Sequence, residues 1–223
     1  LPVTLEIGFI SAFIACIFGI PLGIISATKP NTLIDVFVRL FGLIGLSFPN
    51  FWLATLLLLF TSLHFNWIPG LTYVPLWEDP IGNLKQMILP SVILSFQLMA
   101  ITMRMTRATM LEELKQDYIR TARAKGLSMK IVVNKHAMKN AMIPILTIAS
   151  VQLGYLLSGS VIIEQIFGLP GIGWFFLQGL LDRDYPVVQI MALFMVCVFV
   201  FVNLLTDIAY AYLDPRIKYD TKQ

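Results

Sequence analysis

Five long apolar runs constrain this chain more than any other feature of its sequence. A bilayer core about 30 Å thick is crossed by roughly 20 helical residues, and most of the runs reach that length with charges only near their ends. The runs cover residues 3–27, 36–63, 87–103, 141–163 and 187–210. Hydrophobic residues make up 57% of the 223 residues and charged residues 13%, whereas about a quarter of a typical soluble chain is charged. The sequence therefore predicts an all-α, polytopic transmembrane bundle that forms a single domain over residues 1–223.

The basic residues between the runs predict the orientation of the bundle. Alternate connections lie on one side of a membrane, and one set of connections holds 14 of the 16 Lys and Arg residues. By the positive-inside rule, this set, 28–39, 104–140 and 211–223, faces the cytoplasm, and the connections 64–86 and 164–186 face the outside. The visible chain would then start outside, so we expect that at least one earlier span is missing.

The same composition and the lack of catalytic motifs exclude several classes of protein. Low charge and high hydrophobicity exclude a disordered chain and a nucleic-acid-binding domain. Cys16 and Cys197 both lie in apolar runs and indicate neither a disulfide framework nor a metal site. No Gly precedes a Lys, so there is no Walker A loop, and neither His-Glu-x-x-His nor Gly-x-Ser-x-Gly occurs. We expect no enzyme activity, no metal and no cofactor on this chain.

The connection 104–140 is the only long polar stretch, and it holds nine of the basic residues. Three explanations compete: an orientation signal, a patch for anionic lipids, or a docking site for a soluble partner. The charge count alone favours the orientation signal. The residue pattern shifts the balance towards docking, because it predicts two helices joined by a sharp turn.

The pattern of this connection predicts each helix end. Asp117 is suited to cap a short helix through Lys125, and Gly126 is suited to the left-handed position that ends it. Ser128 is a good N-cap for a second helix that continues into the fourth run. The small residues Thr121, Ala122 and Ala124 would let another protein approach the short helix closely. Such a unit is shaped to transmit force from a cytosolic partner to a span.

The residues 117–128 and 136–144 resemble the cytoplasmic coupling loop of ABC importer permeases of the oligopeptide, dipeptide and nickel class. Four further stretches, 1–6, 167–174, 183–189 and 214–217, are also similar to that family, and together with the span order the resemblance covers essentially the whole chain. The broader permease consensus has Glu-Ala-Ala, three residues and Gly. Counting back from Gly126 places Arg120, Thr121 and Ala122 there, so the consensus Glu is not matched, and the consensus proline comes later, at Pro144.

The resemblance implies a type I importer permease that usually has six spans and moves di- or oligopeptides by alternating access. It implies ATP and Mg on two separate ATP-binding subunits, an extracytoplasmic substrate-binding protein and a second, homologous permease. The bacterial or archaeal cytoplasmic membrane would be the location. Nickel or a nickel chelate is the alternative substrate.

The resemblance also assigns a set of residues to ATPase coupling. They are Asp117, Tyr118, Arg120, Thr121, Ala122, Arg123, Lys125 and Gly126. We expect Asp117, Ala122 and Gly126 to shape the short helix and the basic side chains to meet acidic groups of the ATPase. An ordinary solvated basic helix is the alternative.

Three uncharged polar residues, Asn50, Gln97 and Gln152, fall near the middle of three different runs. Lipid offers such side chains no hydrogen-bonding partners, so they tend to face protein or a water-filled cavity. We predict that they line part of the substrate path, where a peptide backbone is a plausible guest. The alternative is that they bond neighbouring helices, at roughly 0.6–2 kcal/mol each.

The outer connection 164–186 contains a Gly- and Pro-rich break. After it, residues 172–181 are apolar but too short to cross, which is typical of a re-entrant or surface helix. The candidate outer-gate residues are Gly168, Pro170, Gly171, Gly173 and Trp174. The alternative is a merely interfacial connector.

Two rival functions belong to other classes. A proton-coupled secondary transporter would need an acid or His near a span midpoint, and the runs contain none there. A membrane scaffold with a basic docking loop would differ in lacking ATP-dependent uptake.

Overall fold

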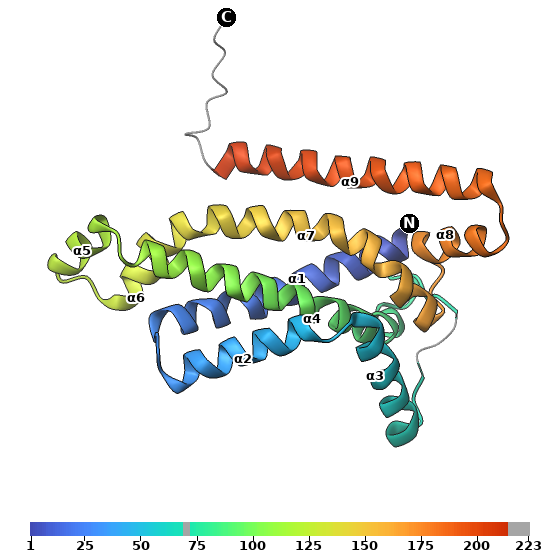
Figure 1. Ribbon diagram of the computed structural model, residues 1–223, viewed down its shortest axis with the longest axis horizontal. Coiled ribbons are helices and arrows are strands. Elements are labelled where there is room, and N and C mark those ends of the chain that lie inside the picture. Colours follow the sequence, from blue (N-terminus) through green and yellow to red (C-terminus); the bar gives the residue numbers. More distant parts are fainter. Residues whose placement is uncertain (69–71, 214–223) are drawn as a thin grey trace, which may run out of the picture.

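The computed structural model describes residues 1–68 and 72–213, together with most of their side chains. In this part of the chain the secondary structure is entirely helical, and most helices run along the long axis of the molecule (Figure 1). The elements are α1 (Pro2–Thr28), α2 (Leu33–Ser47), α3 (Asn50–Phe65), α4 (Pro80–Glu113), α5 (Asp117–Ala124), α6 (Met129–Ile131), the π-helical segment η1 (Val132–Ala137), α7 (Met138–Phe167), α8 (Ile172–Leu181) and α9 (Tyr185–Leu213).

The helices confirm the predicted all-α membrane bundle. Three are long and apolar enough to cross a membrane alone, namely α1, α4 and the Tyr185–Leu205 part of α9. Two bent pairs satisfy the same criterion together, α2 with α3 and the end of α7 with α8, so the described residues give up to five crossings. The protein is therefore a multi-pass membrane protein.

The second apolar run is not the single helix that its hydropathy predicts. The axes of α2 and α3 differ by 96°, and α3 leaves the bundle sideways (Figure 1). The cause is Pro49, whose ring disfavours a helical conformation at the preceding residue. Phe48 is accordingly extended, with φ −95° and ψ 127°, and Asn50 starts a new helix instead of lying in mid-span.

Helix α4 forms the centre of the bundle, and α1 packs along it through a stripe of small residues. A Cβ atom built on Gly19 would lie 3.0 Å from the Met99 carbonyl oxygen, and one built on Gly23 would lie 2.6 Å from Cβ of Thr106. The Gly-x-x-x-Gly spacing thus lets the two backbones approach closely. This contact fixes the two helices on which the other elements are arranged.

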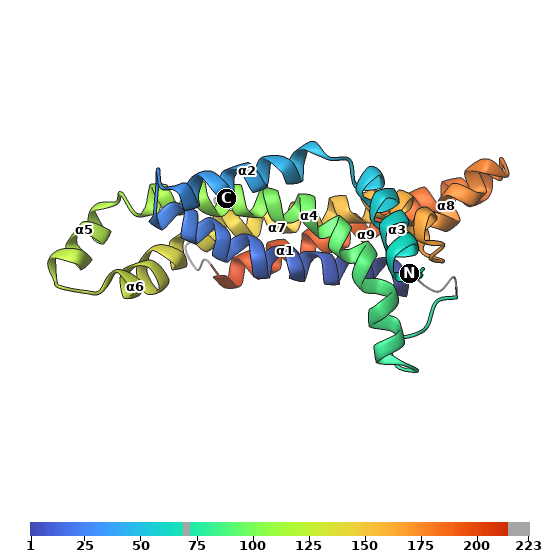
Figure 2. The same cartoon turned by 90° about the horizontal axis from the view of Figure 1, so that it is seen from below.

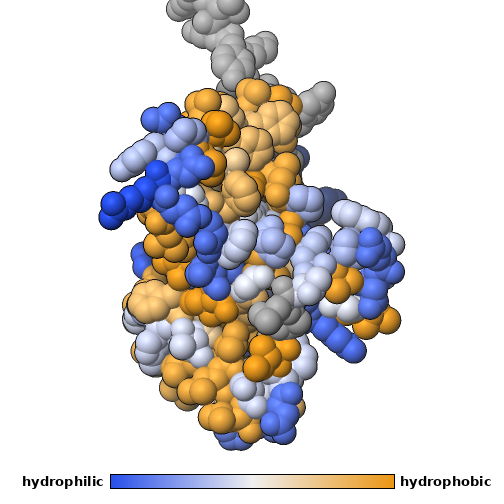
Figure 3. All heavy atoms as spheres, turned by 90° about the vertical axis from the view of Figure 1, so that its right-hand side faces the viewer, coloured by the Kyte–Doolittle hydropathy of each residue, from blue (hydrophilic) through white to orange (hydrophobic). Residues whose placement is uncertain are grey.

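The two ends of the bundle differ in chemistry. The short helices α5 and α6 project together from one end in both side views (Figures 1 and 2), where α1 ends, α2 begins and α7 begins. The opposite end carries the N-terminus and α8, and its surface shows groups of hydrophilic side chains flanked by hydrophobic ones (Figure 3). Of the three basic connections, 28–39 and 104–140 meet at the α5 end, as the positive-inside rule predicts, and the basic residues of 211–223 lie outside the described residues.

The predicted connection 104–140 is shorter in the structure. Helix α4 continues to Glu113 and α7 is already helical at Met138, so residues 104–113 and 138–140 extend the bundle helices. Arg104 and Arg107 consequently belong to a bundle helix and not to a loop.

Candidate coupling helix, translocation path and outer turn

Helix α5 is attached to the bundle by its apolar face. Ile119 is fully buried and Ala122 nearly so, in a cluster that includes Met110 of α4 and Val132 and Val133 of η1. This contradicts the expectation that Ala122 lets a partner approach, because its methyl group packs inside this chain. Only Thr121 and Ala124 remain exposed among the small residues of the helix. The buried face therefore holds α5 firmly against α4 and η1.

The opposite face of α5 carries exposed charges. Arg120, Arg123 and Lys125 are all exposed, and Arg120 lies 3.6 Å from the Asp117 carboxylate in a fully solvated pair. The predicted capping role of Asp117 is wrong: Gln116 occupies the N-cap position, without a side-chain cap. Asp117 instead lies in the first turn, where the helix dipole favours a negative charge. The exposed face thus offers three cations to a partner.

Tyr118 joins the coupling helix to two bundle helices. Its hydroxyl donates a hydrogen bond to the Glu113 carboxylate at the end of α4 and accepts one from Asn140 Nδ2 of α7 at 3.0 Å. Burial, followed by the bond to Glu113, raises the pKa of Tyr118 above its ordinary value. The phenol therefore stays protonated, and the link persists, throughout the physiological pH range.

Gly126 makes the turn that follows α5, as predicted. Its φ is +79°, in the left-handed region that strongly favours glycine, and its N–H donates to the Arg123 carbonyl at 2.9 Å. Ser128 occupies the predicted N-cap position of α6, although its side chain makes no capping bond. From there α6, η1 and α7 follow without a gap, so the turn leads directly into a bundle helix.

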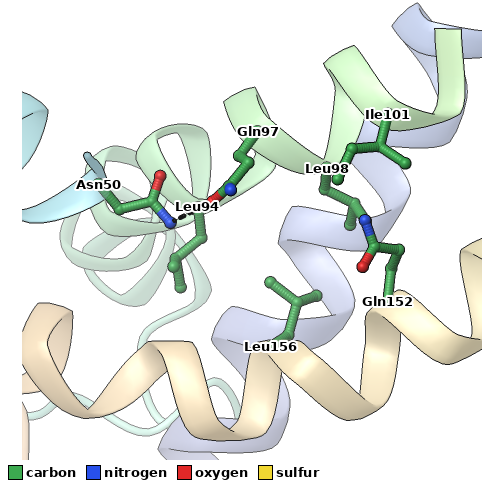
Figure 4. Close-up of a pocket in the computed structure, with 7 residues that line it drawn as sticks. All are labelled: Asn50, Leu94, Gln97, Leu98, Ile101, Gln152 and Leu156. Atoms are coloured by element: carbon green, nitrogen blue, oxygen red, sulfur yellow. Dashed lines mark hydrogen bonds between the residues drawn. The ribbon is translucent and has the colours of Figure 1, made fainter. Parts of the chain in front are cut away.

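The three predicted amide residues meet in one pocket (Figure 4). Asn50 of α3 donates from Nδ2 to Oε1 of Gln97 of α4 at 3.2 Å, and Gln152 of α7 lines the same pocket. The pocket has a volume of about 360 Å³, and leucine and isoleucine side chains form the rest of its wall. The Asn50 Oδ1 atom is buried and has no hydrogen-bond donor among the described residues. One amide pair thus bonds two helices and leaves one buried acceptor of the pair, Asn50 Oδ1, without a donor among the described residues.

The outer turn between α7 and α8 encloses a carboxylate that the sequence reasoning did not single out. Glu164 is fully buried, and it accepts hydrogen bonds from Thr4 Oγ1 and from the Trp174 backbone N–H, each at 2.8 Å. The Thr4 hydroxyl in turn accepts the Ile172 N–H at 2.9 Å. Backbone N–H groups at a helix start suit a negative charge. In the sequence, the position of Glu164 immediately before a Gly- and Pro-rich break was the feature that could have indicated this site.

The glycines of this turn are required by close packing around Glu164. Gly168 ends α7 with φ +62°. A Cβ on Gly171 would lie 2.2 Å from the Glu164 carboxyl carbon, and one on Gly173 would lie 2.6 Å from Cα of Val161. Pro170 is exposed, and Trp174 contributes its backbone N–H. The candidate outer-gate residues therefore lie together at the turn where α8 bends by 83° from the end of α7.

A second group missed in the sequence lies near the α5 end of the bundle. Arg107 of α4 forms a bidentate pair with Asp35 of α2, with Nε–Oδ1 and Nη2–Oδ2 distances of 2.7 and 2.9 Å. Asp35 is fully buried and also accepts bonds from Ser26 Oγ of α1 at 2.5 Å and from the Asn31 N–H at 3.0 Å. The group joins three helices, and it was missed because Arg107 was assigned to the loop.

The outer connection before α4 is also held by specific bonds. Asn83 Nδ2 donates to the Val74 carbonyl at 2.9 Å and Gln86 Nε2 to the Thr72 carbonyl at 3.0 Å. Tyr73 donates to Glu6 Oε2 of α1 at 3.0 Å. Burial and this bond raise the pKa of Tyr73 to about 12. The connection is thus fastened to α1 and α4.

Comparison with known proteins finds relatives that match nearly the whole chain. Residues 19–219 match the family described as binding-protein-dependent transport system inner membrane component. A putative peptide transport system permease protein of Brucella abortus is 43% identical over 220 residues, which is 99% of this chain and 70% of that protein. The dipeptide transport system permease protein of Bacillus subtilis is 40% identical, over 99% of this chain and 69% of its own length.

A third relative and a solved structure extend the comparison. The Escherichia coli dipeptide transport system permease protein is 37% identical over 97% of this chain and 70% of its own length. An inward-facing structure of the MetNI methionine ABC transporter aligns with a TM-score of 0.74, covering 95% of this chain and 93% of that chain. The identity is 21%, so this likeness concerns the fold alone.

Proposed function

Because this chain belongs to the family of binding-protein-dependent transport system inner membrane components, we propose that it is a permease subunit of an ATP-driven peptide importer. Relatives named as peptide and dipeptide transport permeases at 37–43% identity support di- or oligopeptides as the substrate. ATP and Mg would be bound by separate subunits. The importer would reside in the cytoplasmic membrane of a bacterium or archaeon.

The observation that carries this proposal is the physical connection from α5 to the amide pocket. Tyr118 and the buried Ile119 attach α5 to α4 and η1, and α4 and α7 contribute Gln97 and Gln152 to the pocket. A displacement of α5 by an ATPase would therefore reach both walls of the pocket. That is the mechanical requirement of alternating access, in which a substrate site opens first to one side and then to the other.

The remaining partners follow from the exposed surfaces. The exposed cations of α5 suit acidic groups on an ATP-binding subunit, and a pair of such subunits would serve two permeases. None of the Tyr185–Leu205 segment of α9 is buried against the rest of the chain, and a second, homologous permease and the bilayer would cover this apolar surface. The end that carries α8 would receive peptide from the binding protein.

Reconstitution tests this proposal. The permease pair, its ATPase subunits and the binding protein are placed in proteoliposomes, and uptake of a labelled dipeptide is measured with ATP and with a collapsed proton gradient. We expect uptake that requires ATP and survives loss of the gradient. Uptake that follows the gradient would indicate a secondary transporter, uptake of nickel but not peptide would reassign the substrate, and no uptake of either would support a scaffold.

A further inference from the structure

A second pocket adjoins the amide pocket on the side of α5. It has a volume of about 580 Å³ and is lined by α2, α4 and α7, with Arg39, Arg104 and Arg107 among otherwise mostly apolar side chains. Ile101 lines both this pocket and the amide pocket, so the two are neighbours along one face of the bundle. A guest that leaves the amides towards the cytoplasmic end would meet the arginines next.

The positive charge of this second pocket is only partly neutralised. The Asp35 carboxylate is already saturated, because Arg107, Ser26 and the Asn31 N–H donate to it. Arg39 Nε lies 3.6 Å from Asp35, too far for a hydrogen bond. Arg104 forms no ion pair or hydrogen bond within the described residues. Three guanidinium groups therefore share one carboxylate, which leaves an excess of two positive charges.

Arg39 and Arg104 lie inside helices α2 and α4 and not at the helix ends. Arg39 follows the start of α2 by six residues and Arg104 precedes the end of α4 by nine, which at 1.5 Å per residue is about 9 and about 13 Å. Cations that are only partly neutralised inside a membrane-protein bundle usually face a water-filled cavity or meet an anion. The guanidinium group is well suited to a carboxylate, which it binds through two parallel hydrogen bonds.

We propose that Arg39 and Arg104 form a carboxylate-binding site on the cytoplasmic side of the translocation path. This inference rests on the proposed function and specifies the substrate: the amide pocket bonds the peptide backbone, and the arginine pocket receives a carboxylate. Peptides with an acidic side chain are favoured at this step, and cationic substrates are disfavoured. Arg107 is a positioning residue here, because its two hydrogen bonds occupy both oxygens of Asp35 and leave Arg39 without a hydrogen bond to that carboxylate.

The test compares two dipeptides of equal size, one with an acidic and one with a basic side chain, in the reconstituted importer. Arg104→Gln and Arg39→Gln are each compared with the unaltered protein, and the ratio of the two uptake rates is measured. The ratio of the two uptake rates does not depend on the amount of folded variant, because both rates scale with that amount. Dividing it by the ratio for the unaltered importer cancels the preference of the binding protein for one dipeptide. We expect the acidic-to-basic ratio to fall about fivefold, as expected for loss of one charge-assisted bond in a wet site.

Two further variants and one change of lipid separate the alternatives. Arg104→Lys keeps the charge and should restore most of the ratio, whereas Lys29→Gln removes a charge at the same end of the bundle but outside the pocket and should leave the ratio unchanged. An unchanged ratio in both arginine variants overturns the proposal. The proposal is also overturned if the variants lose uptake of both peptides equally and only in vesicles that contain phosphatidylglycerol, since that result indicates a lipid headgroup site. Failure of the unaltered importer to take up either peptide overturns the proposed function itself.

Discussion

Thr4 and Glu164 are joined by a buried 2.8 Å hydrogen bond although 160 positions separate them in the chain. The same threonine hydroxyl accepts the Ile172 N–H, so one side chain connects the start of α1, the end of α7 and the start of α8. The Glu164 carboxylate accepts from this hydroxyl and from the Trp174 N–H. The outer end of the bundle is therefore one hydrogen-bonded unit.

Replacing Thr4 by valine should destabilise this outer unit. Valine has nearly the same shape but can neither donate to Glu164 nor accept from Ile172, and unpaired buried groups cost about 1–3 kcal/mol. Thermal unfolding of the purified complex should show a lower midpoint. Thr55→Val is the matched control, because the Thr55 hydroxyl is exposed and bonds only its own helix at the Phe51 carbonyl. Equal midpoints for the two variants would contradict the role of Thr4.

Gly173→Ala should displace the start of α8. A Cβ there would lie 2.6 Å from Cα of Val161, a backbone atom that cannot move aside without shifting α7. Overpacking of this kind costs about 1–3 kcal/mol, and we expect both a lower unfolding midpoint and slower peptide uptake. Gly8→Ala provides the comparison, since nothing lies within 4 Å of the added atom. A Gly173 variant as stable and active as the Gly8 variant would disprove the close packing of the outer turn.

The features that could be predicted from the sequence are those set by residues close together in the chain. Apolar runs identify helices because a bilayer requires them, and Gly126 predicts a left-handed turn because few other residues adopt that conformation readily. The sequence did not predict the Asp35–Arg107 pair or the Glu164 site, since each depends on which helices become neighbours. Charge counts treated Arg107 as a loop residue, although it lies in α4 and bonds a residue 72 positions away.

Arg107→Met should be strongly destabilising, whereas adding Asp35→Asn should recover part of the loss. Removing the arginine alone leaves a fully buried carboxylate without its cation, at a cost of about 3 kcal/mol. Neutralising both partners removes the uncompensated charge. The check is a double-mutant cycle on unfolding midpoints, and a double variant no more stable than Arg107→Met alone would show that the charge pair is not the cause.

The amide pocket makes a prediction about water access. In a background with Cys16 and Cys197 replaced by alanine, Asn50→Cys, Gln97→Cys and Gln152→Cys should each react with a water-soluble thiol reagent in at least one transport state. Transported peptide should slow the labelling. Ser11→Cys, fully buried between α1 and α4, should stay unlabelled. Absence of labelling at all three positions in every state would leave the amides only their helix-bonding role.

The hydropathy of the second run, residues 36–63, did not reveal that the run forms two helices. It is continuously apolar, yet Pro49 divides it into two helices because the residue before a proline is driven out of the helical region. After the bend Asn50 stands at a helix start, where its amide lies 3.2 Å from Gln97. The three amides line one pocket, which their chemistry alone could not place, and their role in a substrate path stays a prediction.

Gly126 ends the helix α5 that we propose couples an ATPase to the translocation path, so its substitution tests this coupling. Apart from the chain neighbours, no atom lies within 4 Å of an added Cβ, so the strain of Gly126→Val comes mainly from its φ of +79°, at about 1–2 kcal/mol. The measurement is the number of peptides imported per ATP hydrolysed by the assembled complex, with Gly126→Asn as the control because asparagine tolerates this conformation. We predict that valine lowers this ratio about tenfold or prevents assembly, and that asparagine preserves it. A valine variant with unchanged uptake and unchanged stimulation of ATP hydrolysis would contradict the proposed coupling.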